Sequence, residues 1–186
     1  MGNYRTPLVL YELQIGTLEL LLPGNVRLNM STTLSNGRAN YILFQNLASR
    51  CTGLAAGSEG GASDLAEGHE VKAYSDATLY PNKDLFQTSA SSTFGANNNG
   101  PLIKRLLEAG DYAGALRVCK ETGYDKNRAY IYTNTRDFRP SVPFRYVIVP
   151  KELVLRLLSP QDPRNISRNA ILSRVQRVER INPKSL

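Results

Sequence analysis

One short stretch of the chain combines acidic and basic side chains at a spacing that could support hydrolytic chemistry. Asp64 is followed, after five residues, by Glu70-Val71-Lys72. The surrounding residues predict a tight turn feeding a strand, and alternate residues of a strand share a face. Glu70 and Lys72 would then point the same way, whereas Val71 and Ala73 would point into the core. The turn would bring the Asp64 carboxylate beside them.

This set of groups suits the hydrolysis of a phosphodiester bond. Two carboxylates supply the oxygen ligands that Mg²⁺ prefers, and the ion keeps some of its waters. A bound metal activates one water and offsets the charge of the transition state. The Lys72 ammonium could orient or deprotonate that water and contact the phosphate. Two alternatives stay open: Glu67 could replace Asp64 as a ligand, and the cluster could be a surface ion pair at a strand end.

Hydrophobic spacing and turn signals indicate the elements that must hold these groups. Leu43, Leu47, Cys51 and Leu54 recur at the spacing of one helix face. Pro101 favours the first turn of a helix, and Gly110-Asp111 separates that helix from a second one. Segments rich in aromatic and β-branched residues predict strands. The predicted order is a helix at 38–54, a strand within 64–74, helices at 102–107 and 112–122, strands at 129–135 and 144–149, and helices at 151–158 and 169–181.

This order of elements predicts a mixed α/β domain with a small central sheet covered by helices. The chain of 186 residues has the length of a single domain, which we expect to span residues 1–186. Within it, residues 1–34 would form an N-terminal arm available for dimerisation. Residues 35–155 would form the core that carries the acidic stretch, and residues 156–186 a basic C-terminal segment.

The positive charge is concentrated in the last 51 residues. The sequence holds 23 Lys and Arg residues against 16 Asp and Glu, a net charge of +7. Residues 136–186 contain 11 of these basic residues and 4 of the acidic ones, so they carry the whole excess. Sixteen of the 23 cations are Arg, whose planar guanidinium suits phosphate and guanine. The pattern favours a polyanionic partner, with a solvated basic tail as the alternative.

Two groups of residues are the candidate nucleic-acid contacts. The first is a set of arginines in and before the helix predicted at 169–181, where they would contact phosphates: Arg164, Arg168, Arg174 and Arg177. The second is Asn97-Asn98-Asn99, in a polar loop before Pro101, because Asn pairs with adenine. The alternatives are a solvated helix face and a flexible loop in which Asn99 caps the next helix.

Cysteine usage and hydropathy bear on the compartment. Cys51 and Cys119 are far apart and form no CxxC pattern, which predicts free thiols and a reducing cytoplasm. His69 is the only histidine, and on a regular strand it would face away from Glu70, so we expect a structural role for it and no zinc site. No run of 18 apolar residues occurs, and no membrane association is expected.

Ser63-Asp64 with Glu70-Val71-Lys72 resembles the PD-(D/E)xK motif of type II restriction endonucleases and related nucleases. The short Asp-to-Glu spacing is similar to that of the mismatch-repair endonuclease branch. Three downstream stretches resemble the helix, strand and strand endings of several restriction enzymes: GANNNGPLIKRLL, RAYIYTNTRDF and FRYVIVPKELV. In element order the resemblance covers about residues 38 to 155.

The resemblance implies a restriction-endonuclease-like α/β fold, with a central mixed β-sheet flanked by helices. It also implies a Mg²⁺-dependent, site-specific hydrolase that cleaves both strands of double-stranded DNA and leaves 5′-phosphates. A palindromic site would be cut by a homodimer with one active site per strand. By this analogy Asp64 and Glu70 are metal ligands, the Val71 carbonyl is a third, and Lys72 positions the water.

Two departures from the family pattern concern the acidic groups. Ser63 stands where the family usually has Pro. Many relatives carry another acid on the preceding helix, whereas residues 38–54 hold no Asp or Glu and offer Gln45 and Asn46 instead. A second metal would need a carboxylate from elsewhere, namely Glu12, Glu19 or Glu59.

Two other functions are consistent with the sequence. The chain could be a non-catalytic, basic nucleic-acid-binding module, in which the acidic stretch is a strand-end ion pair. It could also bind another protein through residues 102–122, which read like the turn of one tetratricopeptide hairpin. A repeat array needs about three such units, so a local helical pair is the simpler interpretation.

Overall fold

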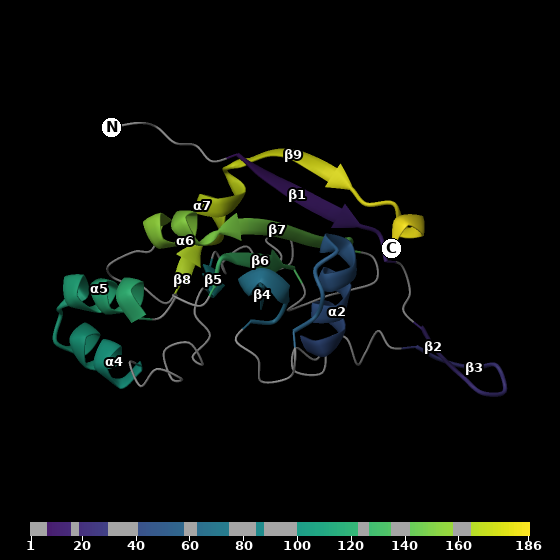
Figure 1. The fold of residues 1–186 in the computed structure, drawn as a ribbon, viewed down its shortest axis with the longest axis horizontal. Helices are drawn as coiled ribbons and strands as arrows, with labels where there is room; N and C mark the ends of the chain where they lie inside the picture. Colours follow the sequence, from purple (N-terminus) through teal and green to yellow (C-terminus); the bar gives the residue numbers. More distant parts are fainter. Residues whose placement is uncertain are drawn as a thin grey trace.

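A five-stranded mixed β-sheet forms the centre of the protein, and helices cover its two faces (Figure 1). The computed structural model describes residues 7–15, 19–29, 41–57, 63–74, 85–87, 100–122, 127–134, 142–157 and 165–186. The expected mixed α/β architecture with a central sheet flanked by helices is confirmed. None of the helices in these ranges is long and apolar enough to cross a membrane.

The strands of the sheet lie in the order β4-β6-β7-β1-β9. Strand β4 runs parallel to β6, and β9 runs parallel to β1, while the β6–β7 and β7–β1 pairs are antiparallel. The bounds of these strands are β1 Leu8–Leu13, β4 His69–Ala73, β6 Ala129–Thr133, β7 Phe144–Pro150 and β9 Val175–Arg180. Strands β4 and β9 are therefore the two edges of the sheet.

Side-chain alternation along the strands divides the core into two clusters. On β6, Tyr130 and Tyr132 point to one face and Ile131 to the other, and all three are fully buried. Helix α2 (Tyr41–Thr52) covers the Ile131 face. The opposite face is covered by four helices: α4 (Gly100–Glu108), α5 (Tyr112–Thr122), α6 (Lys151–Leu157) and α7 (Arg168–Leu172).

Two small sheets and two short 3₁₀ turns complete the described structure. Strands β2 (Glu19–Leu22) and β3 (Val26–Asn29) form a hairpin within the expected N-terminal arm, and β5 (Leu85–Gln87) pairs with β8 (Asn165–Ser167). In the hairpin turn Gly24 and Asn25 both have positive φ, a conformation for which these residue types are suited. The 3₁₀ turns are η1 (Ala66–Gly68) and η2 (Pro183–Ser185).

Most of the predicted elements of the core are present, with two corrections. The helix predicted at 38–54 is α2, but its most deeply buried side chains are Phe44 and Ala48, while Leu43 is exposed. The helix predicted at 169–181 is wrong. Only residues 168–172 are helical, and the chain then turns and forms β9.

The short length of α7 has a local cause and a distant one. Ser167 caps its start by accepting a hydrogen bond from the Ala170 N–H, and the Ser173 N–H bonds the Asn169 carbonyl at its end. The next residues then pair with β1, where the Leu8 N–H donates to the Arg174 carbonyl at 3.0 Å. Backbone pairing with this distant strand replaces the continuation of the helix.

Candidate active site

A tight turn leads the chain into β4 and closes on itself. The Leu65 N–H donates to the His69 carbonyl at 2.9 Å. Between them, Glu67 and Gly68 both have positive φ, at 57° and 74°. Gly adopts this conformation freely, whereas Glu67 is held there at a cost. The His69 ring bonds the Ala66 carbonyl at 3.0 Å, in line with the structural role expected for it.

Asp64 lies beside β4 because the turn directs its carboxylate at the backbone of that strand. The Val71 N–H donates to Asp64 Oδ2 at 2.9 Å. The Asp64 main chain is held in turn by two donors to its carbonyl, Gln45 Nε2 at 2.5 Å and the Gly57 N–H at 2.8 Å. Helix α2 therefore contributes Gln45, one of its two expected polar candidates, to the fixing of this aspartate.

The Val71 carbonyl points to the same side of the strand as the Asp64 carboxylate. The N–H and C=O of a strand residue point in one direction, and the Val71 N–H faces the outer edge of β4, away from β6. One edge of the sheet thus carries a carboxylate and a carbonyl oxygen that belong to the expected ligand set. The strand order places no described strand on this edge.

Glu70 and Lys72 form an ion pair on the adjacent face of β4. Lys72 Nζ lies 2.5 Å from Glu70 Oε1, and the two side chains are only 14% and 10% exposed. The register partners of Glu70 and Lys72 on β6 are Tyr130 and Tyr132, respectively, so two tyrosine side chains flank the pair on the same face of the sheet. The same-face geometry predicted for the two residues is therefore present, and the pair is buried instead of being a surface pair.

The alternation predicted for the neighbours of this pair is half correct. Val71 is buried among the residues that pack on α2, as expected. Ala73 is exposed, because β4 ends there at the margin of the sheet. The inward position predicted for Ala73 is wrong.

A buried asparagine that the sequence did not single out, Asn127, lies next to this site. Ser63 Oγ is 3.4 Å from Asn127 Oδ1, and Asn127 Nδ2 is 3.3 Å from the Tyr130 hydroxyl. Asn127 is only 1% exposed. Asn127 lies just before the strand predicted at 129–135, and this position alone does not predict its burial. Its contact with Ser63 depends on tertiary structure, for which the local sequence gives no indication.

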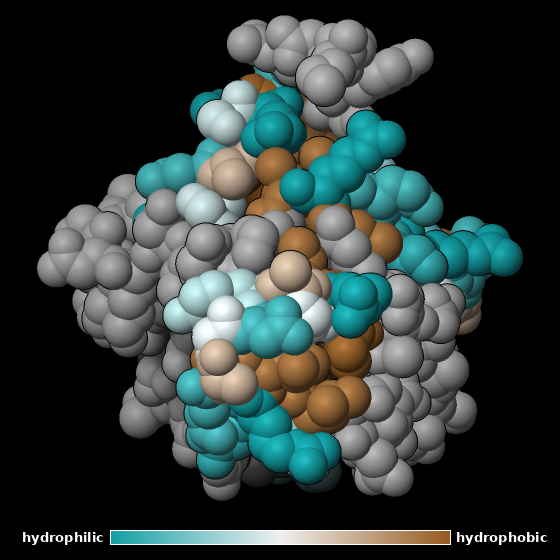
Figure 2. All heavy atoms as spheres, turned by 90° about the vertical axis from the view of Figure 1, so that its left-hand side faces the viewer, coloured by the Kyte–Doolittle hydropathy of each residue, from teal (hydrophilic) through white to brown (hydrophobic). Residues whose placement is uncertain are grey.

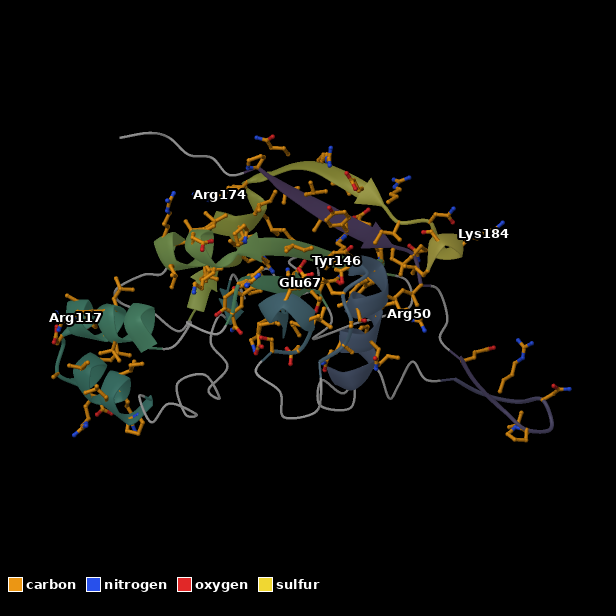
Figure 3. All side chains as sticks on the ribbon, viewed as in Figure 1. Arg50, Glu67, Arg117, Tyr146, Arg174 and Lys184 are labelled. Atoms are coloured by element: carbon orange, nitrogen blue, oxygen red, sulfur yellow. The ribbon has the colours of Figure 1, made fainter. Side chains whose placement is uncertain are left out.

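The other acidic candidates do not join Asp64 and Glu70. Glu12 lies on β1, three strands away from β4 and hence at about 14 Å, and it pairs with Arg145 at 2.7 Å. Glu19 pairs with Arg27 in the β2–β3 hairpin, and Glu67 is exposed (Figure 3). Glu59 lies outside the described residues. Within the described ranges, no group of three His, Cys, Asp or Glu residues is placed to hold a metal.

Two groups on the α2 face have raised pKa values. Burial raises the pKa of the Cys51 thiol to about 11. Burial also raises the pKa of Tyr146, whose hydroxyl donates to the Cys51 carbonyl at 3.3 Å. A thiol with so high a pKa is a poor nucleophile near neutral pH, so Cys51 is a packing residue. Cys119 lies in α5, and nothing is described of its side chain.

The arginines expected to contact phosphate have different surroundings. Arg168 is only 2% exposed, so it does not offer a surface contact, and that assignment is corrected. Arg174 bonds the Ala170 carbonyl through its guanidinium, and Arg177 pairs with Glu179 at 2.7 Å. The helix predicted to carry Arg174 and Arg177 does not exist, because the chain leaves α7 before Arg174 and forms β9 from Val175. Figure 3 shows Arg174 just before the start of β9 and Lys184 in η2, beyond the other end of the strand.

The remaining expected contacts, Asn97, Asn98, Asn99 and Arg164, lie outside the described residues. The helical pair α4–α5 is described, and it forms one end of the molecule. Figure 2 faces this end and shows hydrophobic residues reaching the surface among hydrophilic ones. Leu102 and Tyr112 are exposed there, which is the surface that the protein-interaction alternative would use.

Comparison of the chain with protein-family models, with curated proteins and with solved structures found no match.

Proposed function

We propose that the protein is a Mg²⁺-dependent endonuclease that hydrolyses phosphodiester bonds in double-stranded DNA. The observation that carries this proposal is the hydrogen bond from the Val71 N–H to Asp64 Oδ2. It brings a carboxylate from a separate turn against the strand that bears Glu70 and Lys72. An acid-and-lysine pair alone is a common structural device, whereas a second, independently held carboxylate supports hydrolytic chemistry.

The candidate donor atoms, at the outer edge of β4 and on its adjacent face, fit a hard divalent cation. Asp64, Glu70 and the Val71 carbonyl offer only oxygen, which is the ligand type of Mg²⁺. A carboxylate has several lone pairs, so accepting the Val71 N–H does not by itself prevent Asp64 from binding a cation. When bound there, the ion would lower the pKa of a water and stabilise charge on the phosphate.

Other residues of the chain would orient the attacking water, hold the Asp64 carboxylate in place and attract the DNA. The short Glu70–Lys72 contact fixes the lysine ammonium on one face of β4, from which it would orient the attacking water or contact the scissile phosphate. Gln45 and Gly57 hold the Asp64 main chain, so the carboxylate is pre-positioned before substrate binds. The excess positive charge of residues 136–186 would attract the DNA backbone.

The test is a substitution that removes charge and keeps shape. Asp64→Asn retains an oxygen that accepts the Val71 N–H, so the fold should be unchanged, while Mg²⁺-dependent cleavage of a mixture of long double-stranded DNAs should fall by about a hundredfold or more. Asp111→Asn is the matched control. Asp111 also accepts a backbone N–H, from Gly114 at 2.9 Å, but it lies at the start of α5.

Cleavage would be followed on gels with and without Mg²⁺, and DNA binding by a gel shift in Ca²⁺. The proposal requires that Asp64→Asn binds but does not cut and that Asp111→Asn does both. If the wild-type protein gives a salt-sensitive gel shift and no cutting, it is a non-catalytic binding module. If Asp64→Asn cuts normally, the site is wrong.

A further inference from the structure

We propose that the outer edge of β9 is the interface through which two copies of this chain form a dimer. In the dimer, the two β9 strands would pair antiparallel about a two-fold axis and join the two five-stranded sheets. The inference concerns association only, so it stands or falls independently of the proposed nuclease activity.

The first support is the exposure of this edge. Strand β9 is the last strand of the sheet, and no described strand pairs with its outer side. Figure 1 shows it as the outermost element on its side of the sheet. Val178, at its centre, is 53% exposed, and Gln176, Arg177 and Arg180 are also exposed. An edge with unpaired backbone groups is a template for another strand.

The backbone direction limits how a second strand could pair. The Ile181 N–H donates to the Glu12 carbonyl at 2.8 Å, so residues 177, 179 and 181 turn their backbone groups toward β1. Residues 178 and 180 then direct theirs outward, whereas the bulge opposite Leu8 and Val9 interrupts the alternation before Arg177. A two-fold antiparallel pair that uses these outward groups can be centred on Arg177, Val178, Glu179 or Arg180, because the axis can pass through a hydrogen-bonded or a non-hydrogen-bonded pair of residues.

The side chains select one of these registers. Centring on Arg177, Glu179 or Arg180 would place two identical charges opposite each other at the axis. Centring on Val178 places Arg177 opposite the partner's Glu179, and by symmetry Glu179 opposite the partner's Arg177. The sequence of this strand is therefore complementary in charge to a second copy of itself.

The geometry of the Val178 register also suits these pairs. With Val178 in the hydrogen-bonded position, Arg177 and the partner's Glu179 fall at a non-hydrogen-bonded position, where side chains of facing residues lie closest. On the other face, the two Val178 side chains meet, and Gln176 lies opposite the partner's Arg180. The ion pair that Arg177 already makes with Glu179 in one chain would become part of a group of four alternating charges.

The test uses two single variants that should fail alone and succeed together. Arg177→Glu and Glu179→Arg each place like charges across the two-fold axis, so each should raise the dimer Kd by about tenfold to a hundredfold. Mixed, they should form a heterodimer as tight as the wild-type dimer, because glutamates in one chain then face arginines in the other. The ion pair within each chain stays broken in this mixture, so only contacts between chains explain its recovery.

Sedimentation analysis of the full chain in the absence of DNA and Mg²⁺ measures all four Kd values. Val178→Pro tests the backbone hydrogen bonds between the two chains. It removes an outward N–H and leaves the backbone groups that bond β1. It should abolish the dimer without lowering the melting temperature of the monomer. A wild-type chain that stays monomeric at the highest soluble concentration would show that the charges of β9 merely protect a free edge. A dimer indifferent to the charge reversals would overturn the proposed register.

Discussion

The two edge strands of the sheet each carry one acid–base pair two residues apart, and they differ in what covers it. On β4, Glu70 and Lys72 lie 2.5 Å apart with side chains 10% and 14% exposed. On β9, Arg177 and Glu179 lie 2.7 Å apart with side chains 68% and 43% exposed. Strand alternation sets the same local geometry in both pairs. The surrounding residues decide whether the charges must stay paired, because burial makes an unpartnered charge costly.

The two edges also differ in the hydrogen bonding of their outward-facing backbone groups. At β4 the turn at residues 63–68 folds back, and Asp64 accepts the outward N–H of Val71. At β9 the outward groups of residues 178 and 180 face away from every described strand. The turn at residues 63–68 therefore covers the β4 edge and brings polar groups together there. The β9 edge stays available for association with another chain.

Removal of the buried lysine should give the largest effect. Lys72→Met leaves the Glu70 carboxylate buried without its ammonium, and we expect the free energy of unfolding to fall by about 3–5 kcal/mol in urea titrations. Adding Glu70→Gln should recover much of this loss, since no charge then remains buried. A loss below about 1 kcal/mol for Lys72→Met would mean that the β4 pair behaves like a surface pair.

A substitution that disturbs the close packing around the Asp64 main chain should give the next largest loss of stability. A Cβ at Gly57 would lie 2.4 Å from the Ser63 carbonyl oxygen and 3.1 Å from that of Asp64. Gly57→Ala should cost about 1–3 kcal/mol and displace Asp64, so stability and cleavage should fall together. The control is Gly53→Ala, which meets nothing within 4 Å but has φ +73°; it should lower stability by about 1 kcal/mol through backbone strain and leave cleavage intact. Equal cleavage by the two variants would argue against a role for this packing.

A smaller effect is expected from the polar residues behind the β4 pair. Tyr130→Phe removes the hydroxyl that lies 3.3 Å from Asn127 Nδ2. Since Asn127 is buried, thermal or urea unfolding should show a loss of about 1–2 kcal/mol. Tyr112→Phe changes an exposed tyrosine on α5 and should have no measurable effect. Similar results for the two variants would show that the hydrogen bond to Asn127 contributes nothing.

The exposed pair should give the smallest effect on folding. Arg177→Met, measured at a concentration where the chain is monomeric, should change the free energy of unfolding by less than about 0.5 kcal/mol. Lys72→Met is the same kind of substitution on the opposite edge. The difference between the two losses of unfolding free energy measures how much burial increases the cost of removing the cation from such a pair. A cost for Arg177→Met that matches the one for Lys72→Met would remove the distinction between the two edges.

The sequence predicted those elements whose signals are local. Pro101 and Gly110-Asp111 mark the start and separation of α4 and α5, and the runs AYIYT and FRYVIV gave β6 and β7. Glu70 and Lys72 could be placed on one face because strand alternation needs no tertiary information. The closeness of Asp64 followed from the tight turn, although the hydrogen bond to Val71 is known only from the structure.

The errors arose where distant contacts decide the conformation. Ile171, Val175 and Val178 recur at helical spacing, yet residues 175–180 pair with β1, more than 160 positions earlier in the chain. The burial of Arg168 likewise depends on the elements packed around α7, since Arg is rarely buried. Neither the burial of Glu70 nor the contact of Ser63 with Asn127 has a local sequence signal.

The place of β1 in the sheet has a consequence for the order of folding. Its neighbours in the sheet are β7 and β9, so β1 pairs with segments that are synthesised more than 130 residues later. These pairings span most of the chain, and closing such long loops slows folding. Until β7 emerges, both edges of β1 are unpaired, and its mostly apolar sequence LVLYEL is exposed. The nascent chain should therefore bind a chaperone that shields extended apolar segments.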